Sequence, residues 1–472
     1  MEVPLRNLPK HQKYAAQYKP NDIFWGLGVE HETYLEATPQ RQVPVSFIMN
    51  NRKPERYSVN YYSNYILDSL NEAFTSLFPD LSATYDLPIL LNSHSFNCLD
   101  ASGEHRTTYE RNPKPNPKFN GEFLIDTIRN HNSYLNKEYE QSYIFDGDTI
   151  EFMTQRYYKA TVDKVIDELT QIETEFISNL NSTFQSLNIL SPYLPFQIQT
   201  KNHPFANHLT NLKNPSMFNN GTMHVNITLP TRLDASNQIA DFDLFVEQHK
   251  NFARVIQWIE PLQAAFYGSP DPFSTVDSKF SATSQRLAVS RYICLGTYDT
   301  ATMPLGKILQ VPNTYSWLKE YHQESAYNSL SQIGLDLNFY KHFNHGLEIR
   351  YFDSVPIADL EEILKSFVHL ADFSLQNPDL PTNRHPIWEQ VTKKILANGK
   401  STPLTQEELE FYWRLFKINK KYELDESAEQ LYNDIIFHLK SIDGACCKYF
   451  FGESQINFVE EVESTSCWCS YC

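Results

Sequence analysis

Basic side chains are scarce in this sequence relative to acidic ones. Its 472 residues include 40 Lys and Arg against 57 Asp and Glu, which gives a formal net charge of −17 at pH 7. Because nucleic-acid backbones are bound by clustered Lys and Arg, this balance argues against a broad nucleic-acid surface. We therefore expect no nucleic-acid partner.

Long apolar runs are also lacking. No stretch approaches the ~20 apolar residues of a membrane-spanning helix. Residues 1–20 are polar and lack the apolar run of a secretory signal, so we treat them as an N-terminal extension. These absences predict a soluble, cytoplasmic protein without a transmembrane segment.

Cysteines are few, and most of them lie near the C-terminus. Cys98 and Cys294 stand alone, and this distribution is not the framework of a small disulfide-rich domain. The spacing in the tail, residues 446–472, fits no zinc pattern, and the last four residues lack the aliphatic interior of a prenylation box. An acylated membrane tether and a plain flexible end both stay open for this tail. Its cysteines are Cys446, Cys447, Cys467, Cys469 and Cys472.

The length and composition predict a large folded core. Hydrophobic residues make up 41% of the chain and aromatic residues 14%. A chain of this length exceeds the size at which a single core keeps growing, so we expect a main domain with an appended region. We divide the chain into an extension over 1–20, a catalytic domain over 21–355, a helical region over 356–445 and the tail.

Hydrophobic periodicity predicts the main elements. We expect strands over residues 21–37, 43–49, 144–154 and 346–352. We expect helices over 61–77, 162–176, 242–259 (ending before Pro261) and 288–292, with further helices across 357–440. A capping box at Thr405 and Glu408 predicts a helix start there. The proline-rich segment 111–121 is expected to be a surface loop.

Three short segments place polar residues two apart, just after a glycine. Because successive side chains of a strand point to opposite faces, Glu30 lies on the same face as Glu32, and His224 on the same face as Asn226. Glu348 and Arg350 form the third pair. If the three strands are neighbours, their polar faces form a wall of carboxylates with one imidazole and one guanidinium. His31 falls between two glutamates and is expected to point away from them.

This residue set suits hard divalent cations and a polyphosphate. Carboxylates with a single histidine favour Mg²⁺ or Mn²⁺ over zinc, which would recruit more His or Cys. Arginines would hold a phosphoryl group during transfer, and ATP is the expected nucleotide. The candidate metal ligands are Glu30, Glu32, Glu151, His224 and Glu348.

Four segments, taken in order, resemble the glutamine synthetase/glutamate–cysteine ligase superfamily, which includes the amidoligases. They are Gly-Val-Glu-His-Glu-Thr-Tyr-Leu at 28–35, Ile-Glu-Phe-Met-Thr at 150–154, Asn-Asn-Gly-Thr-Met-His-Val-Asn at 219–226 and Gly-Leu-Glu-Ile-Arg-Tyr-Phe-Asp at 346–353. The match is spread over roughly residues 21–355. It implies an α+β fold in which an antiparallel sheet forms a funnel-shaped site covered by helices on its outer face.

The resemblance also implies roles for individual residues. Glu30, His224 and Glu348 match the ligands of one metal, and Glu32 and Glu151 match ligands of another. Arg350 and Arg291 resemble arginines that contact the transferring phosphate, with Arg286 and Asn226 as further nucleotide-binding candidates. A further metal carboxylate has no firm counterpart, and the available residues are Asp148 and Glu122.

Together these features predict an ATP-dependent carboxylate–amine ligase that forms an amide, such as a γ-glutamyl bond, through an acyl phosphate. Small amino acids or peptides would be its substrates. The sequence contains no G-x-S-x-G elbow, and this mechanism needs no nucleophilic side chain. A catalytically silent nucleotide- or amino-acid-binding regulator, a phosphotransferase of related architecture and a metal-dependent amide hydrolase stay open. The acyl donor, the amine and the oligomeric state are also open.

Overall fold

The computed structural model describes most of the chain. The described residues are 19–51, 80–108, 114–203, 205–217, 219, 221–236, 238–269, 284, 336–337, 346–381, 385–421, 426–442 and 444–452. The helices expected over 61–77 and 288–292 lie outside these ranges. Arg286, Arg291, Cys294 and the tail cysteines at 467, 469 and 472 also lie outside them.

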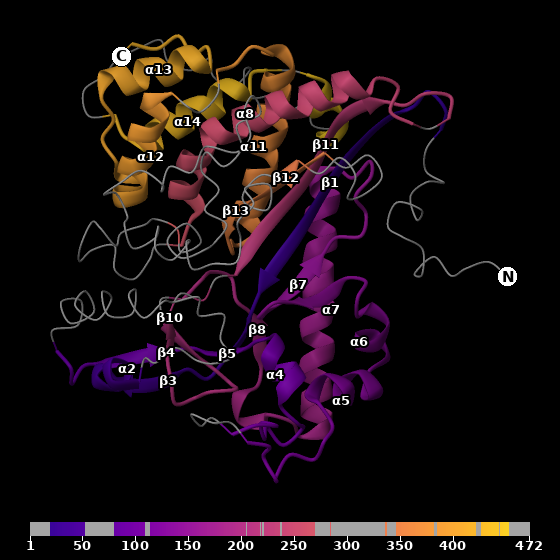
Figure 1. Ribbon diagram of the computed structural model, residues 1–472, viewed down its shortest axis with the longest axis vertical. Helices are drawn as coiled ribbons and strands as arrows, with labels where there is room; N and C mark the ends of the chain where they lie inside the picture. The colour runs from indigo at the N-terminus through magenta and orange to yellow at the C-terminus, as the bar shows by residue number, and fades with distance from the viewer. Residues whose placement is uncertain are drawn as a thin grey trace, which may run out of the picture.

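The fold is α+β, with antiparallel sheets and covering helices (Figure 1). The main sheet has six strands, and every neighbouring pair in it is antiparallel. In sheet order the strands are β12 (Asp336–Leu337), β13 (Leu347–Asp353), β11 (Thr222–Arg232), β1 (Ile23–Thr33), β7 (Thr149–Met153) and β6 (Tyr143–Asp146). The strands expected over 21–37 and 346–352 are therefore present, the first with one interruption.

A smaller, five-stranded sheet continues from the main one, and a separate two-stranded ladder lies beside the smaller sheet. In order, the strands of the smaller sheet are β10 (Ser216–Met217), β9 (Phe205–His208), β5 (Ile89–Leu91), β2 (Leu35–Ala37) and β8 (Phe196–Ile198). The ladder pairs β3 (Arg41–Pro44) with β4 (Thr84–Leu87). The expected strand over 21–37 is thus divided at Tyr34, where the chain passes from one sheet to the other.

The helices lie largely on one side of the sheets and at the two ends of the molecule. Figure 1 shows α8 and α11–α14 gathered at one end, and α4, α5 and α6 near α7 at the other. Their bounds are α2 Val45–Asn51, α4 Ser93–Cys98, α5 Leu124–His131, α6 Ser133–Glu138, α7 Val162–Leu187, α8 Phe242–Tyr267, α11 Ile357–Gln376, α12 Pro386–Asn398, α13 Gln406–Leu415, α14 Ala428–Leu439 and α15 Ala445–Phe451.

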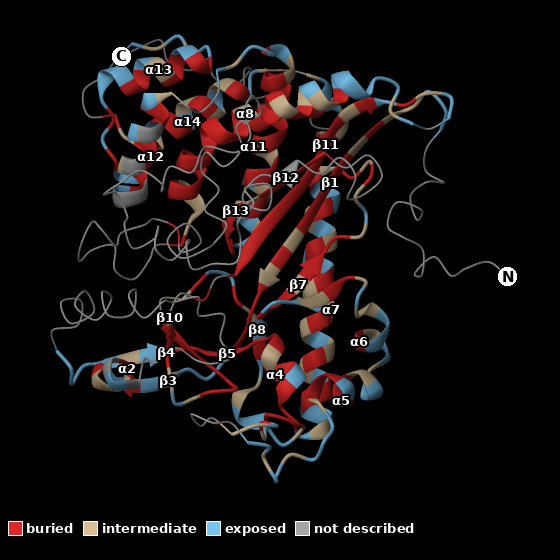
Figure 2. Cartoon of the chain, in the orientation of Figure 1, coloured by how far each residue is buried: buried red, intermediate tan, exposed pale blue. Residues whose placement is uncertain are grey.

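The predicted helical character of 357–440 is confirmed, as is the helix beginning at Val162. The capping box is also confirmed: Thr405 accepts from the Glu408 backbone N–H, and the Glu408 carboxylate accepts from that of Thr405. The helices pack on one face of the main sheet in a continuous apolar core, seen as the red interior of Figure 2. Among the described residues, no helix is long and apolar enough to cross a membrane.

Two expected strands are wrong in detail. Strand β3 ends at Pro44, which cannot donate to a ladder, and α2 begins at Val45. Val45 and Ile48 are both buried at helical spacing, which so short an apolar run does not distinguish from a strand. The expected strand over 144–154 is a hairpin of β6 and β7, because Gly147, at φ +57°, opens a two-residue turn.

The expected end of a helix before Pro261 is also wrong, because α8 continues to Tyr267. Proline lacks the N–H that would bond the carbonyl four residues earlier, and that carbonyl belongs to Gln257. In the structure the Trp388 indole N–H donates to it at 2.7 Å, from α12. A donor far along the chain thus satisfies the carbonyl that proline leaves open.

This substitution of donors can be tested with a double-mutant cycle. We expect Trp388→Phe to lower the free energy of unfolding by ~1–3 kcal/mol, because a buried carbonyl loses its partner. Pro261→Ala supplies a backbone N–H in its place and should recover part of that loss, as measured by chemical denaturation. Trp413→Phe is the matched control, because the Trp413 indole nitrogen is buried with no hydrogen-bond partner among the described residues. If Pro261→Ala changed the free energy of unfolding equally in the unaltered protein and in Trp388→Phe, the coupling would be contradicted.

Candidate metal centre

The three polar segments predicted to converge lie on adjacent central strands. In the register of β1 and β11, Glu30 stands opposite His224, and in that of β11 and β13, Asn226 stands opposite Glu348. Opposed residues of an antiparallel pair share a face of the sheet. A register shift between Met223 and Val225 places both Arg350 and Tyr351 beside His224.

The side chains meet at the imidazole of His224. Its Nδ1 lies 3.3 Å from Glu30 Oε2, 3.5 Å from Glu32 Oε1 and 3.7 Å from Glu348 Oε1. The ligand atoms of Glu30, His224 and Glu348 lie within 4.8 Å of one another. Two ligands at ~2.1 Å from one Mg²⁺ lie at most ~4.2 Å apart, so a small movement of the side chains would let a single ion contact all three.

The site concentrates negative charge away from water. The Glu348 side chain is fully buried, and those of Glu30 and Glu32 are each 15% exposed. Arg350 donates to Glu348, one of the three carboxylates gathered at His224. Burying an excess of like charge is costly unless a counter-charge is bound. The donor set therefore fits a divalent cation.

Asn226 provides a second, independent indication of a missing partner. Its amide nitrogen donates to Glu30 Oε1 at 3.3 Å. Its carbonyl oxygen is buried and has no hydrogen-bond partner among the described residues. Buried polar atoms of this kind are normally satisfied, and a carbonyl oxygen beside carboxylates is a suitable ligand for a hard cation.

The other predicted ligands are placed differently. Glu151 on β7 stands opposite Glu32 in the register, so both carry side chains on the same face. Asp148, in the turn before β7, accepts from the Asn92 amide at 2.7 Å and lies 3.7 Å from His94 Nε2. Glu122 is exposed in the loop before α5. Glu32 and Glu151 are thus neighbours, whereas Asp148 contacts a separate group and Glu122 faces solvent.

His31 points away from the carboxylates, as predicted. On the helix-covered face its Nδ1 lies 2.6 Å from Glu173 of α7, and its Nε2 lies 2.8 Å from the hydroxyl of Ser354. It therefore links β1 both to a covering helix and to the residue that follows β13. This contact supports the sheet from behind the metal centre.

The two glycines that precede Glu30 make room for an aromatic side chain. A Cβ atom on Gly26 would lie 2.2 Å from the ring of Tyr157, and one on Gly28 would lie 3.0 Å from it. The Tyr157 hydroxyl bonds Thr228 on β11. Burial raises the pKa of this phenol, so Tyr157 stays neutral. It lies over the polar face at the end of β1 away from Glu32.

Sequence reasoning missed Thr222 as a participant. Its hydroxyl donates to Glu32 Oε2 at 3.1 Å and lies 3.2 Å from His224 Nε2. The signal was available, because Thr222 precedes His224 by two residues and shares its face.

Asp353, at the end of β13, was also missed, and it fastens three loops. It accepts from the Asn202 amide at 3.0 Å, the Ser269 backbone N–H at 2.9 Å and the Ser284 hydroxyl at 2.6 Å. These partners are 69 to 151 residues from Asp353 in the sequence, so no local pattern predicts them.

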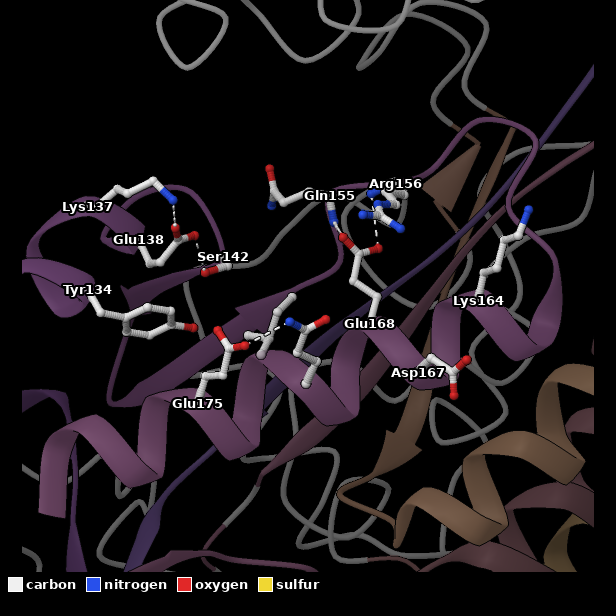
Figure 3. A pocket seen from close by; sticks show the side chains of 12 residues that line it. Tyr134, Lys137, Glu138, Ser142, Gln155, Arg156, Lys164, Asp167, Glu168 and Glu175 are labelled. Atoms are coloured by element: carbon white, nitrogen blue, oxygen red, sulfur yellow. Dashed lines mark hydrogen bonds and ion pairs between the residues drawn. The ribbon is translucent and has the colours of Figure 1, made fainter. Parts of the chain in front are cut away.

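A pocket of about 420 Å³ lies between α6, the hairpin and α7 (Figure 3). Two of its acidic residues are engaged: Glu168 accepts from the backbone N–H groups of Gln155 and Arg156, and Glu138 accepts from Lys137 and Ser142. The bonds of Glu168 fasten α7 to the segment that follows the hairpin. The pocket therefore serves packing, and the buried carboxylate cluster is the better candidate site.

Comparison with known proteins places the chain beside a viral relative. No family model matches the sequence. It is 37% identical over 406 residues to the uncharacterized protein R704 of Acanthamoeba polyphaga mimivirus, an alignment that covers 84% of this chain and 71% of the relative. The chain belongs to the family of that viral protein. Because this relative is uncharacterized, the chemistry has to be argued from the site.

The gathering of buried carboxylates predicts a stability change whose sign depends on whether a metal ion is bound. In chelator-treated protein we expect Glu32→Gln to raise the free energy of unfolding by ~0.5–1 kcal/mol, because it relieves repulsion among buried carboxylates. In saturating Mn²⁺ the same variant should be less stable than the unaltered protein. Thermal unfolding in both conditions measures this. The exposed Glu122→Gln should change stability by less than ~0.5 kcal/mol in either, and destabilisation by Glu32→Gln in chelator would contradict the electrostatic account.

Proposed function

We propose that this protein is a metal-dependent, ATP-dependent carboxylate–amine ligase. The observation that carries the proposal is the convergence of Glu30, Glu32 and Glu348 on His224, with Arg350 bonded to one of the carboxylates. Such a set binds hard cations and a polyphosphate, and ATP-dependent acyl activation requires both. The antiparallel arrangement of β13, β11, β1 and β7 also supports it.

The order of the four motifs adds support through their resemblance to the glutamine synthetase/glutamate–cysteine ligase superfamily. Their four strands are adjacent in the main sheet, and their polar residues share one face. The finer expectation, a funnel-shaped site formed by this sheet, is part of the same proposal.

The residues divide into groups that would hold two cations and a phosphate. Glu30, His224 and Glu348 would hold one Mg²⁺ or Mn²⁺, with the Asn226 carbonyl oxygen at its edge. Glu32 and Glu151, opposed on neighbouring strands, would hold another. When bound, the cations neutralise the phosphate oxygens of ATP and orient them for transfer. Arg350 would contact the phosphoryl group that moves.

The reaction proceeds in two balanced steps. A substrate carboxylate oxygen takes the terminal phosphoryl group of ATP, the bond between that phosphorus and the bridging oxygen of ATP breaks, and ADP leaves. The nitrogen of an amine then attacks the acyl carbon, the bond from that carbon to the phosphate oxygen breaks, and phosphate and a proton are released. The protein contributes positioning and charge neutralisation, so no covalent bond to the chain is needed.

An ADP-release screen tests the proposal. Pairs of amino acids and short peptides are supplied with ATP and Mg²⁺ or Mn²⁺, and we expect ADP release that requires both an acyl donor and an amine. Glu30→Gln should reduce the rate at least ~100-fold, because it removes a ligand at the reacting phosphate. Glu122→Gln should retain it.

Other outcomes distinguish the competing activities. ADP release without an amine, with a phosphorylated product, would favour a phosphotransferase. Amide cleavage without ATP would favour a hydrolase. ADP release unchanged in Glu30→Gln would overturn the site assignment, and no turnover with any pair would overturn the ligase proposal.

A further inference from the structure

The imidazole of His224 presents its two nitrogens to different partners. Its Nδ1 faces the carboxylates, with Glu30 Oε2 at 3.3 Å and Glu348 Oε1 at 3.7 Å, and its Nε2 lies 3.2 Å from the Thr222 hydroxyl. A neutral imidazole carries one hydrogen, and only the nitrogen without it can bind a cation. The position of that hydrogen therefore decides whether His224 is available as a metal ligand.

The hydrogen bonds of Thr222 determine this position. Thr222 is 2% exposed, and its hydroxyl donates its one hydrogen to Glu32 Oε2 at 3.1 Å, because a carboxylate can only accept. The hydroxyl oxygen then has only lone pairs to offer to His224. The Nε2 that faces it has to supply the hydrogen, and this leaves the lone pair of Nδ1 directed at the carboxylates.

The distances around Nδ1 fit this assignment. A bare Nδ1 and a carboxylate oxygen are both acceptors, so no hydrogen bond holds them together, and a shared cation is the group that would. Adjacent ligands of an octahedral Mg²⁺ are ~3.0 Å apart, and opposite ligands are ~4.2 Å apart. The separations of Nδ1 from Glu30 Oε2 and Glu348 Oε1, 3.3 Å and 3.7 Å, lie between these two values.

The strand register places Thr222 for this role. It precedes His224 by two residues on β11, so both side chains lie on one face, and it stands opposite Glu32 of β1. Gly221, the residue before it, lets the two strands approach closely, because a Cβ atom there would lie 3.0 Å from the Glu32 carbonyl oxygen. The two hydrogen bonds of Thr222 thus follow from the pairing of β1 with β11.

We propose that Thr222 is a positioning residue for metal binding, whose hydroxyl keeps the hydrogen of His224 on Nε2 and so makes Nδ1 the ligand atom. This inference rests on the proposed function, because it names the nitrogen through which His224 would hold the cation shared with Glu30 and Glu348. A hydrogen bond to the second nitrogen of a ligating histidine typically changes metal affinity about 10- to 100-fold.

The Mn²⁺ affinity of the full chain, measured by electron paramagnetic resonance, tests the proposal without requiring turnover. Thr222→Val keeps the shape of the side chain but removes the hydroxyl, and we expect it to weaken Mn²⁺ binding at least ~10-fold. Thr222→Ser keeps the hydroxyl and should retain most of the affinity. Thr33→Val is the matched control, because the buried hydroxyl of Thr33 donates to the Gln199 carbonyl at 3.1 Å. It should leave Mn²⁺ affinity unchanged.

Nitrogen NMR of the His224 ring provides a readout that a purely structural role would not change. In the unaltered protein with Mg²⁺, we expect the hydrogen on Nε2 and none on Nδ1, with the signals assigned by their loss in His224→Gln. In Thr222→Val at the same Mg²⁺ concentration, the hydrogen should no longer be confined to Nε2. A hydrogen on Nδ1 in the unaltered protein would overturn the proposal, whether or not the valine variant folds.

The remaining outcomes separate this inference from the proposed function. Unchanged Mn²⁺ affinity in Thr222→Val, or equal losses in Thr222→Val and Thr222→Ser, would overturn the positioning role. An equal loss in Thr33→Val would overturn it as well, because it would show a general effect of removing a buried hydroxyl. No Mn²⁺ binding to the unaltered protein would overturn both proposals. Mn²⁺ binding that requires the Thr222 hydroxyl, without ADP release from any substrate pair, would count against the ligase proposal alone.

Discussion

The antiparallel pairing of β1 with β11 is the constraint on which the rest of the structure depends. Each strand has 11 residues, and their register sets Glu30 opposite His224. Because side chains alternate, a slip of one residue would turn every carboxylate of β1 into the apolar core and expose Val29 and Leu27. Burial of the apolar set and convergence of the polar set are therefore two consequences of one register.

The same pairing explains how the sheet tolerates polar groups on both faces. On the helix side, His31 is satisfied by Glu173 and Ser354, so it requires no ligand. On the open side the ligand atoms of Glu30, His224 and Glu348 lie within 4.8 Å of one another, and the carbonyl oxygen of Asn226 has no hydrogen-bond partner among the described residues. The bonds of His31 indicate a structural role, whereas the buried carboxylates gathered beside the unbonded Asn226 oxygen support the proposed cation site.

Local periodicity predicted what depends on neighbours in sequence. The alternation in β1, the long α7, the capped α13 and the orientation of His31 all follow from side chains a few residues apart. Local periodicity failed where contacts between residues distant in the sequence determine the structure. Pro261 does not end α8 because Trp388 supplies the missing donor. The role of Asp353 depends on its bonds to Asn202, Ser269 and Ser284, which lie far from it in the sequence. The fold class and much of the carboxylate cluster were thus predictable, but contacts between residues distant in the sequence were not.

The change of sheet at Tyr34 is the step that periodicity could not predict. A single straight strand would carry Glu36 along the same sheet, beside the continuation of β11. Because the chain instead pairs with β5 and β8 from Leu35 onward, Glu36 comes into the same row as His208. One continuous polar stripe thus serves two sheets with different neighbours. It carries the candidate metal ligands where it pairs with β11, and it carries Glu36, bonded to His203, where it pairs with β5.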